Sequence, residues 1–313
     1  MISSDSASKK ILVVLVGPTA SGKTDISIRL AQEFGASIIS ADSRQFYQEM
    51  IIGTAAPNPE ERAAAPHFFV QHISIHDKYD VWTYEKEAIA KINALHKHSD
   101  IVVLTGGSGL YIDAICNGLD DLPDTEAEIR CMLKQEFDEK GIEFLREKLR
   151  QADPEYFAKV DIHNPGRMMR ALEVCISTGK PFSSFHSGKK KERPFQILYF
   201  GISWPREKLV ERIHLRVEKM LECGLETEAK QLFGLRHLNA LNTVGYRELF
   251  DHFSGKISFE AAIENIRTNT RRYAKRQMTW FRRNEAIRWF GYDEFEKMKG
   301  EVYGFPDSAC RNR

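Results

Sequence analysis

A glycine-rich segment near the N-terminus carries the residue types that bind phosphate. It reads Gly17-Pro18-Thr19-Ala20-Ser21-Gly22-Lys23-Thr24. Glycines let backbone N–H groups turn inward around an anion, Lys23 adds a positive charge, and the Thr24 hydroxyl can reach a Mg²⁺ ion. The motif predicts a site for a di- or triphosphate, with Thr24 as a magnesium ligand, and does not say which phosphate compound binds.

This phosphate-binding loop, or P-loop, lies between an apolar run and an amphipathic run. The run Ile11–Val16 is short and β-branched, which predicts a buried strand. After Thr24, apolar residues alternate with charged ones as in an amphipathic helix. Strand, loop and helix in this order are the context that a P-loop requires. We therefore expect an α/β fold with a P-loop NTPase-like parallel sheet at its core.

A carboxylate follows the second predicted strand. Residues 37–41 predict that strand, and Asp42 comes directly after it. Ligands of open parallel sheets sit at the carboxyl ends of strands, so Asp42 should lie beside the P-loop if the two strands are close neighbours. The structural alternative is an aspartate that only caps a turn or a helix.

The next buried strand, predicted for residues 100–105, ends in glycines and the Ser108 hydroxyl. P-loop proteins that hydrolyse ATP commonly place an acidic magnesium ligand at such a strand end. Its absence here argues against motor ATPases and GTPases and favours a small-molecule transferase. A P-loop kinase of a small metabolite is the alternative, with Asp42 deprotonating an alcohol.

The middle of the chain has a different pattern. Residues 122–194 contain four helical periods and no predicted strand, so we expect an inserted all-helical subdomain, with residues 1–121 and 195–313 forming the core. Thr125–Glu128 fits a capping box for its first helix. After the return to the core, Arg212 and Arg216 lie four residues apart on a predicted helix and could converge on one anion.

Charge is segregated in one late helical segment. Residues 265–284 contain no acid, and Tyr273, Trp280 and Phe281 interleave with a run of basic residues. Basic side chains bind phosphates and aromatic rings can stack on unpaired bases, which favours nucleic acid as a partner. Lys275 and Arg282 are about two helical turns apart, so both can point to one side. Trp280 could instead belong to the core.

Composition limits the remaining classes of protein. The net charge of +1 gives no global sign of nucleic acid, so any such site must come from local charge. The five cysteines form no Cys-x-x-Cys pair, which argues against structural zinc and disulfides and fits a reducing cytoplasm. Residues 1–10 contain no apolar signal region, and no run reaches the ~18 apolar residues of a membrane span.

Several segments together resemble one family, the bacterial tRNA dimethylallyltransferases, also called tRNA isopentenyltransferases. The resemblance runs from residue 11 to about residue 290 and is far more specific than a P-loop alone. The matching segments are residues 17–24, Ile-Ser-Ala-Asp-Ser-Arg-Gln-Phe-Tyr (39–47), Ile-Gly-Thr-Ala-Ala-Pro (52–57), Ala-Pro-His (65–67), Gly-Gly-Ser-Gly-Leu-Tyr (106–111), Asn-Pro-Gly-Arg-Met-Met-Arg-Ala-Leu-Glu (164–173), Val-Gly-Tyr-Arg (244–247) and Lys-Arg-Gln-Met-Thr-Trp-Phe-Arg (275–282).

The resemblance implies transfer of a dimethylallyl group from dimethylallyl diphosphate to N6 of the adenine 3′-adjacent to the anticodon of tRNA. It implies Mg²⁺ as the cofactor, and we expect a cytoplasmic monomer. Asp42 would take the proton of the amine, and Ser108 would hold the amine or a diphosphate oxygen. Arg216 would bind the diphosphate together with the P-loop.

The resemblance also implies which residues face the tRNA. The family usually has threonine where this chain has Ser108, which keeps the hydroxyl but loses the methyl group that restricts its rotamer. The predicted tRNA-facing residues are Asp42, Ser43, Arg44, Gln45, Ser108, Arg130, Gly166, Arg167, Met168, Met169, Arg170, Thr243, Val244, Gly245, Tyr246, Arg247, Lys275, Arg276, Gln277, Met278, Thr279, Trp280, Phe281 and Arg282.

Overall fold

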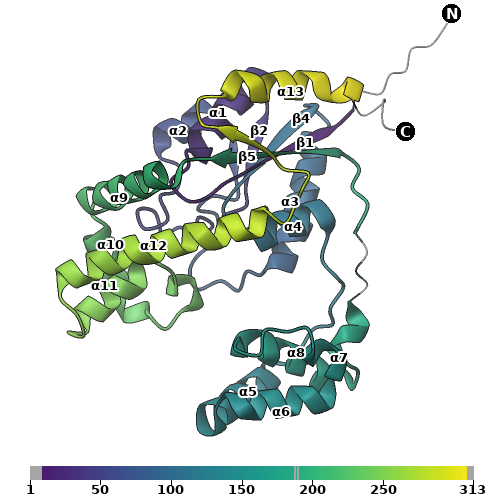
Figure 1. Ribbon diagram of the computed structural model, residues 1–313, viewed down its shortest axis with the longest axis vertical. Helices are drawn as coiled ribbons and strands as arrows, with labels where there is room; N and C mark the ends of the chain where they lie inside the picture. The colour runs from purple at the N-terminus through teal and green to yellow at the C-terminus, as the bar shows by residue number, and fades with distance from the viewer. Residues whose placement is uncertain (1–8, 187, 189, 309–313) are drawn as a thin grey trace, which may run out of the picture. The chain divides into compact units, whose positions relative to one another are not determined.

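The computed structural model (Figure 1) describes residues 9–186, 188 and 190–308. The expectations for residues 1–8 and for Cys310 lie outside the described residues. Contacts divide the chain into a core unit, residues 1–117 and 192–313, and a helical unit, residues 118–191. The boundaries expected from the sequence, at residues 122 and 194, lie a few residues further along the chain.

The core unit contains a parallel sheet of six strands, in the order β3-β2-β4-β1-β5-β6. Its central strand β1 is buried along its whole length, as expected for a parallel sheet that is covered on both faces. The predicted α/β class with a parallel core sheet is confirmed. The strands are β1 (Ile11–Val16), β2 (Ser37–Ser40), β3 (His67–Phe68), β4 (Ile101–Thr105), β5 (Gln196–Ser203) and β6 (Arg288–Gly291).

Helices cover both faces of this sheet. One apolar cluster joins one face to α1 and α13, and a second joins the other face to α3 and α4. A third cluster lies among α9, α10, α11 and α12. The helices of the core unit are α1 (Lys23–Phe34), α2 (Pro59–Ala64), α3 (Val81–Leu95), α4 (Gly109–Asn117), α9 (Arg206–Glu222), α10 (Leu225–Leu232), α11 (Tyr246–Phe253), α12 (Phe259–Phe281) and α13 (Phe295–Ser308).

The helical unit contains the four predicted helices, α5 (Ala127–Lys140), α6 (Ile142–Ala152), α7 (Pro154–Phe157) and α8 (Pro165–Thr178). The Asn164 side chain caps α8 and Pro165 occupies its first turn, as the sequence predicts. The predicted capping box is wrong. Helix α5 begins after Glu126 without a side-chain cap, and the Thr125 hydroxyl accepts a hydrogen bond from Arg170 instead.

Two expectations from composition can be compared with the described residues. The four cysteines within them form no disulfide with one another. None of the helices within the same ranges is long and apolar enough to cross a membrane.

Strands β2 and β4 end so close together that only glycine fits at position 106. A Cβ atom on Gly106 would lie 2.3 Å from the Ala41 carbonyl oxygen. We expect Gly106→Ala to lower the free energy of unfolding by about 1–3 kcal/mol, as overpacking in a core does, measured by urea denaturation. The control is Gly300→Ala in α13, where an added Cβ atom would meet no atom within 4 Å outside the helix's own backbone. It should leave stability unchanged or raise it by up to ~1 kcal/mol. Equal stability of Gly106→Ala and the parent would contradict the steric argument.

Candidate active site

The P-loop connects the end of β1 to the start of α1. Gly22 has a φ of 92°, and a Cβ there would lie 2.6 Å from the Tyr292 ring, so both backbone and space require glycine. The Lys23 ammonium donates hydrogen bonds back to two carbonyls of the loop, those of Gly17 (3.0 Å) and Pro18 (2.8 Å). Burial lowers the pKa of Lys23 to about 8, against a raising effect of the Asp42 carboxylate.

The outer side of the loop is fixed by side chains from beyond β5. The Trp204 indole donates to the Ser21 carbonyl (2.9 Å), and the Arg212 Nε donates to the Ala20 carbonyl (2.8 Å). The Arg212 guanidinium also lies over the Trp204 ring. Arg216, one turn later, donates to the Thr54 carbonyl (3.2 Å). The structure therefore gives the two arginines different partners, and Arg216 alone lines the cavity described below.

Asp42 lies beside the P-loop although β4 separates β2 from β1. The Asp42 charge acts on both Lys23 and Arg216. One Asp42 carboxylate oxygen accepts from the Arg44 backbone N–H (3.1 Å), which is the turn bond of the structural alternative. No described residue forms a hydrogen bond with the other oxygen. A turn role and a chemical role are thus compatible in this residue.

Ser108 joins the ends of β4 and β2. Its hydroxyl oxygen accepts from the Ser43 backbone N–H (3.0 Å) and donates to the Ser43 hydroxyl (3.1 Å), while its own N–H donates to the Ala41 carbonyl. These bonds place Ser108 next to the segment that begins with Asp42. The Ser108 hydroxyl, without the methyl group of threonine, is oriented here by two hydrogen bonds.

A cavity of about 500 Å³ opens at this edge of the sheet. It brings together the predicted catalytic side chains, part of the P-loop and most of the predicted tRNA-facing residues of the core unit. Its lining includes Thr19, Asp42, Ser43, Arg44, Ser108, Arg216, Thr243, Val244, Gly245, Arg247, Tyr273, Arg276, Gln277 and Trp280.

Helix α12 divides the predicted segment 275–282 between this cavity and a second hollow. Residues 276, 277 and 280 line the cavity, whereas Lys275, Met278, Thr279 and Arg282 line a groove of about 710 Å³ between α9 and α12. We call this second hollow the basic groove. The predicted placement of Lys275 and Arg282 on one side is confirmed.

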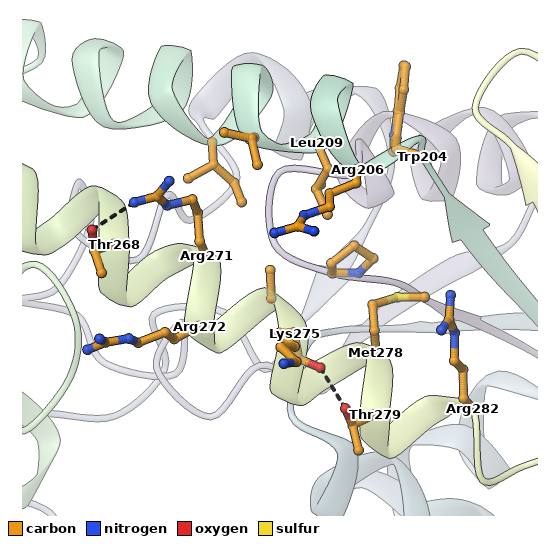
Figure 2. Close-up of a pocket in the computed structure, with 14 residues that line it drawn as sticks. Trp204, Arg206, Leu209, Thr268, Arg271, Arg272, Lys275, Met278, Thr279 and Arg282 are labelled. Carbon is orange, nitrogen blue, oxygen red and sulfur yellow. Dashed lines mark hydrogen bonds between the residues drawn. The ribbon is translucent and has the colours of Figure 1, made fainter.

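The basic groove has an apolar floor and cationic edges. Figure 2 shows Arg206 projecting from the start of α9 into the space between the two helices, with Lys275 on α12 and Arg282 directly after its end. Within the described residues no acid lines the groove, and no side chain pairs with these three cations. The floor includes Leu209, Val210, Ile213 and Ala274.

Gln277 connects three parts of the site. Its side-chain oxygen accepts from the Thr19 N–H of the P-loop (2.8 Å), and its nitrogen donates to the Gly107 carbonyl (2.9 Å). Gln277 is 5% exposed, and a Cβ on Gly107 would lie 2.3 Å from its nitrogen. We infer that this residue, predicted only to face the tRNA, orders α12 and both loops.

Trp280 packs against α4. Its indole nitrogen donates to Asp113 (2.9 Å), and its ring lies where a Cβ of Gly109 would be, 2.3 Å away. Part of the ring is thus already in contact with protein. Stacking of a base on the exposed part stays a prediction.

Three predicted tRNA-facing side chains are corrected by their burial. Met168 lies in the core of the helical unit, Phe281 in the core under the sheet, and Tyr246 in the cluster around α11. Each is 3% exposed or less, so these side chains stabilise the fold and do not reach an RNA surface in this conformation. The apolar character of Met168 and Phe281 indicated this without a structure.

Other predicted contacts have protein partners. Gln45 donates to the carbonyls of Thr54 and Ala55 and does not line the cavity. In the helical unit, Arg170 and Arg130 both pair with Glu173, although Arg130 stays exposed. Also in this unit, Gly166 and Arg167 are exposed at the start of α8, and Met169 is half-buried.

The sequence interpretation missed Tyr273 as a cavity residue. Burial and the Asp42 charge raise the pKa of its hydroxyl. Tyr273 lies three and four residues before Arg276 and Gln277, so the helical period from these two residues was the signal that could have found it.

Known proteins resemble this chain over most of its length. A family model described as IPP transferase matches residues 45–284. A tRNA dimethylallyltransferase of Christiangramia forsetii is 53% identical over 286 residues, which cover 91% of this chain and 95% of the relative. The tRNA dimethylallyltransferase 1 of Bacteroides thetaiotaomicron is 49% identical over 279 residues, which cover 89% and 91%.

Two solved structures with similar names also superpose on this chain. The full-length tRNA isopentenylpyrophosphate transferase of Bacillus halodurans superposes with a TM-score of 0.72 at 32% identity, covering 97% of this chain and 100% of the other. A eukaryotic dimethylallyltransferase acting on tRNA superposes with a TM-score of 0.81 at 25% identity, covering 96% and 80%.

The lowered pKa of Lys23 makes anion binding depend on pH. A bound anion favours the charged ammonium, so affinity should be full below the pKa of about 8 and should fall as pH rises through it. We expect calorimetry with inorganic diphosphate to show this decline between about pH 7 and pH 9. The Lys23→Ala variant is the control, because its pH curve contains only the titration of diphosphate itself. This variant should bind diphosphate more weakly and should lack the decline caused by Lys23. Parallel pH curves for the two proteins would contradict a role for the Lys23 charge.

Proposed function

The chain belongs to the IPP transferase family, and we propose that it transfers a dimethylallyl group from dimethylallyl diphosphate to tRNA. The acceptor is the exocyclic N6 of the adenine 3′-adjacent to the anticodon, and diphosphate is released. The observation that carries this proposal is that Thr19 of the P-loop, Arg216 and Asp42 line one cavity. Such a site has a place for a diphosphate leaving group and a base for an amine within one cavity.

The donor side of the cavity suits a departing diphosphate. As the carbon–oxygen bond of the donor breaks, its electron pair goes to the diphosphate, whose growing charge needs fixed positive partners. The P-loop N–H groups, Lys23 and Arg216 supply them. Arginine keeps its charge at neutral pH even though burial lowers the pKa of Arg216, because its ordinary value is so high.

The acceptor side suits a weakly nucleophilic amine. The target adenine must leave its stack to enter the cavity, which costs a few kcal/mol. Its N6 lone pair then forms the new carbon–nitrogen bond, and the N6 proton passes to Asp42. Ser108 is hydrogen-bonded to Ser43, the residue that follows Asp42. In this position the Ser108 hydroxyl would hold the amine or a diphosphate oxygen.

The donor set fits a magnesium ion that is held mainly by its substrate. The Thr24 hydroxyl lies at the start of α1 beside Lys23. Within the described residues no group of three acidic, histidine or cysteine side chains could hold a metal ion. Magnesium commonly keeps several waters and binds through substrate phosphates, so Thr24 with the diphosphate is a sufficient set. When bound, the ion would neutralise part of the diphosphate charge.

The tRNA would contact both units of the chain. In the core unit we assign it the cations of the basic groove and the cavity residues Thr243, Val244, Gly245 and Arg247. In the helical unit we assign it the exposed residues Arg130, Gly166 and Arg167. A cytoplasmic location suits this substrate, and we propose that the enzyme acts as a monomer.

One assay tests this function. Labelled dimethylallyl diphosphate is incubated with the protein and with tRNA that lacks the modification, and the digested nucleosides are analysed. We expect label on adenosine at the 3′ neighbour of the anticodon, one diphosphate released for each transfer, and no consumption of ATP. ATP consumption that is stimulated by a small alcohol and indifferent to tRNA would instead identify a metabolite kinase.

Replacing Asp42 tests its assignment as the base. Asp42→Asn keeps the shape but cannot take a proton at N6. We expect turnover to fall by about 10²–10⁴-fold, the usual contribution of a positioned base, with a much smaller change in tRNA affinity. Single-turnover transfer rates and filter binding measure the two effects. An Asn variant that turns over at close to the parent rate would exclude Asp42 as the base.

Salt dependence tests the basic groove. Each phosphate contact releases a counterion, so log affinity should fall by ~0.7–0.9 per contact for each log unit of salt. We expect Arg282→Ala to lower this slope by about one contact's share, whatever the tRNA sequence. The control is Arg288→Ala, since Arg288 is an exposed arginine paired with Glu301 on another part of the core unit. Equal slopes for Arg282→Ala and the parent would remove Arg282 from the contact surface.

A further inference from the structure

A single carboxylate holds the turn that follows Met50. Glu228 on α10 accepts hydrogen bonds from three consecutive backbone N–H groups, those of Ile51 (3.0 Å), Ile52 (2.8 Å) and Gly53 (2.9 Å). One carboxylate oxygen takes the first two and the other takes the third. Consecutive N–H groups that point at one anion form a nest, which fixes the backbone of the segment.

Tyr246 completes this arrangement from the other side. Its hydroxyl donates to the Glu228 oxygen that also binds Gly53, at 2.6 Å. Tyr246 is fully buried, and burial together with Glu228 raises the pKa of its hydroxyl, so it remains a donor. A Cβ on Gly53 would lie 2.5 Å from the Tyr246 ring. The turn is therefore fixed both by hydrogen bonds and by steric contact.

The carbonyl groups at the end of this turn face the active site. The Thr54 carbonyl accepts from Arg216 (3.2 Å) and from Gln45 (3.3 Å), and the Ala55 carbonyl also accepts from Gln45 (3.1 Å). The Gln45 backbone N–H in turn donates to the Asp42 carbonyl (3.1 Å). One short segment thus contacts the arginine of the donor side and the segment that carries the base.

We propose that Glu228 is a positioning residue for the donor: it fixes residues 51–54 so that the Thr54 carbonyl orients the Arg216 guanidinium toward the diphosphate. The proposal rests on the proposed function for the identity of the donor. It requires only that Arg216 contacts a diphosphate group. Glu228 itself lies outside the residues that line the cavity.

The chemistry of the nest explains why a carboxylate is needed there. Three N–H groups and one hydroxyl require two acceptor oxygens, and a glutamate side chain offers both. Glutamine has the same size, but its NH₂ group would oppose at least one backbone N–H. Glu228→Gln therefore breaks at least one hydrogen bond of the nest without changing the packing volume. Tyr246→Phe removes only the fourth hydrogen bond and should have a smaller effect in the same direction.

The first test measures binding of inorganic diphosphate by calorimetry, together with kcat and KM of the full-length enzyme. For Glu228→Gln we expect the dissociation constant of diphosphate and the KM for dimethylallyl diphosphate to rise by about 10-fold or more, since a small displacement of a contacting group is costly. The affinity for tRNA should change by less than about 2-fold, which is the variation expected when two sites do not interact energetically. Unchanged diphosphate binding in a folded Glu228→Gln protein would overturn the proposal.

A matched control separates positioning from general stability. Glu49 also accepts from a hydroxyl, Ser74 (2.6 Å), and from a backbone N–H, Ile75 (3.0 Å), but within the described residues its side chain forms no hydrogen bond with the turn 51–54. Glu49→Gln should lower the melting temperature and leave diphosphate binding unchanged. Equal weakening of diphosphate binding in both variants would mean that Glu228 acts only through stability, which overturns the proposal.

A double-mutant cycle identifies the residue through which Glu228 acts. In an Arg216→Met background, Glu228→Gln should cause little further loss of diphosphate affinity, because the group it positions is gone. Full additivity of the two losses would overturn the proposal. A parent protein that binds diphosphate but transfers no prenyl group to tRNA would refute the proposed function instead, and the binding arm of the cycle would still decide the role of Glu228.

Discussion

The arrangement of the active site depends on the side-chain amide of Gln277. Its oxygen and its nitrogen both find backbone partners, one in the P-loop and one in the loop after β4, as a buried amide requires. These two bonds hold α12 across the carboxyl ends of β1 and β4. The helix then separates the cavity that contains Asp42 from the basic groove on its other side. Loss of this amide would disorder a phosphate site and an acceptor site together.

This constraint explains how a P-loop can serve a reaction in which no phosphoryl group moves. In the proposed function, the loop would recognise diphosphate and stabilise its charge, and the rest of the site would decide which bond breaks. An acid that holds magnesium beside the phosphate would favour hydrolysis, and glycines with Ser108 stand at that strand end instead. Asp42, which follows the neighbouring strand β2, lines the same cavity, where we propose that it receives the proton of the amine. The turn held by Glu228 contacts Arg216 on the donor side of the site and Gln45 in the segment that carries Asp42.

Much of this could be predicted from the sequence, because local patterns determined it. The P-loop, the buried strands and the helical insertion follow from glycine spacing and from apolar periodicity. The chain alone could not place β6 or α13, since their packing against β5 is decided by contacts between residues far apart in sequence. The capping box failed for a related reason, because Arg170 competes for the Thr125 hydroxyl.

The same limit applies to the site. The sequence singles out Asp42, Ser108 and Lys23 because each follows a predicted strand or lies in a known motif. Tertiary contacts instead determine the bridging role of Gln277 and the burial of Tyr246. A family motif identifies a set of residues but does not distinguish those that contact substrate from those that stabilise the fold. Here, α12 shows that adjacent residues of one motif can face two different hollows.

The most direct test of the central claim is the fate of the oxygen that bridges carbon and phosphorus in the donor. Dimethylallyl diphosphate labelled there with oxygen-18 is reacted with unmodified tRNA, and both products are analysed by mass spectrometry. A P-loop that holds a leaving group predicts that all the label is released in diphosphate and that adenosine gains only the prenyl group. Label retained by the prenyl group, or a phosphate attached to the tRNA, would contradict this account.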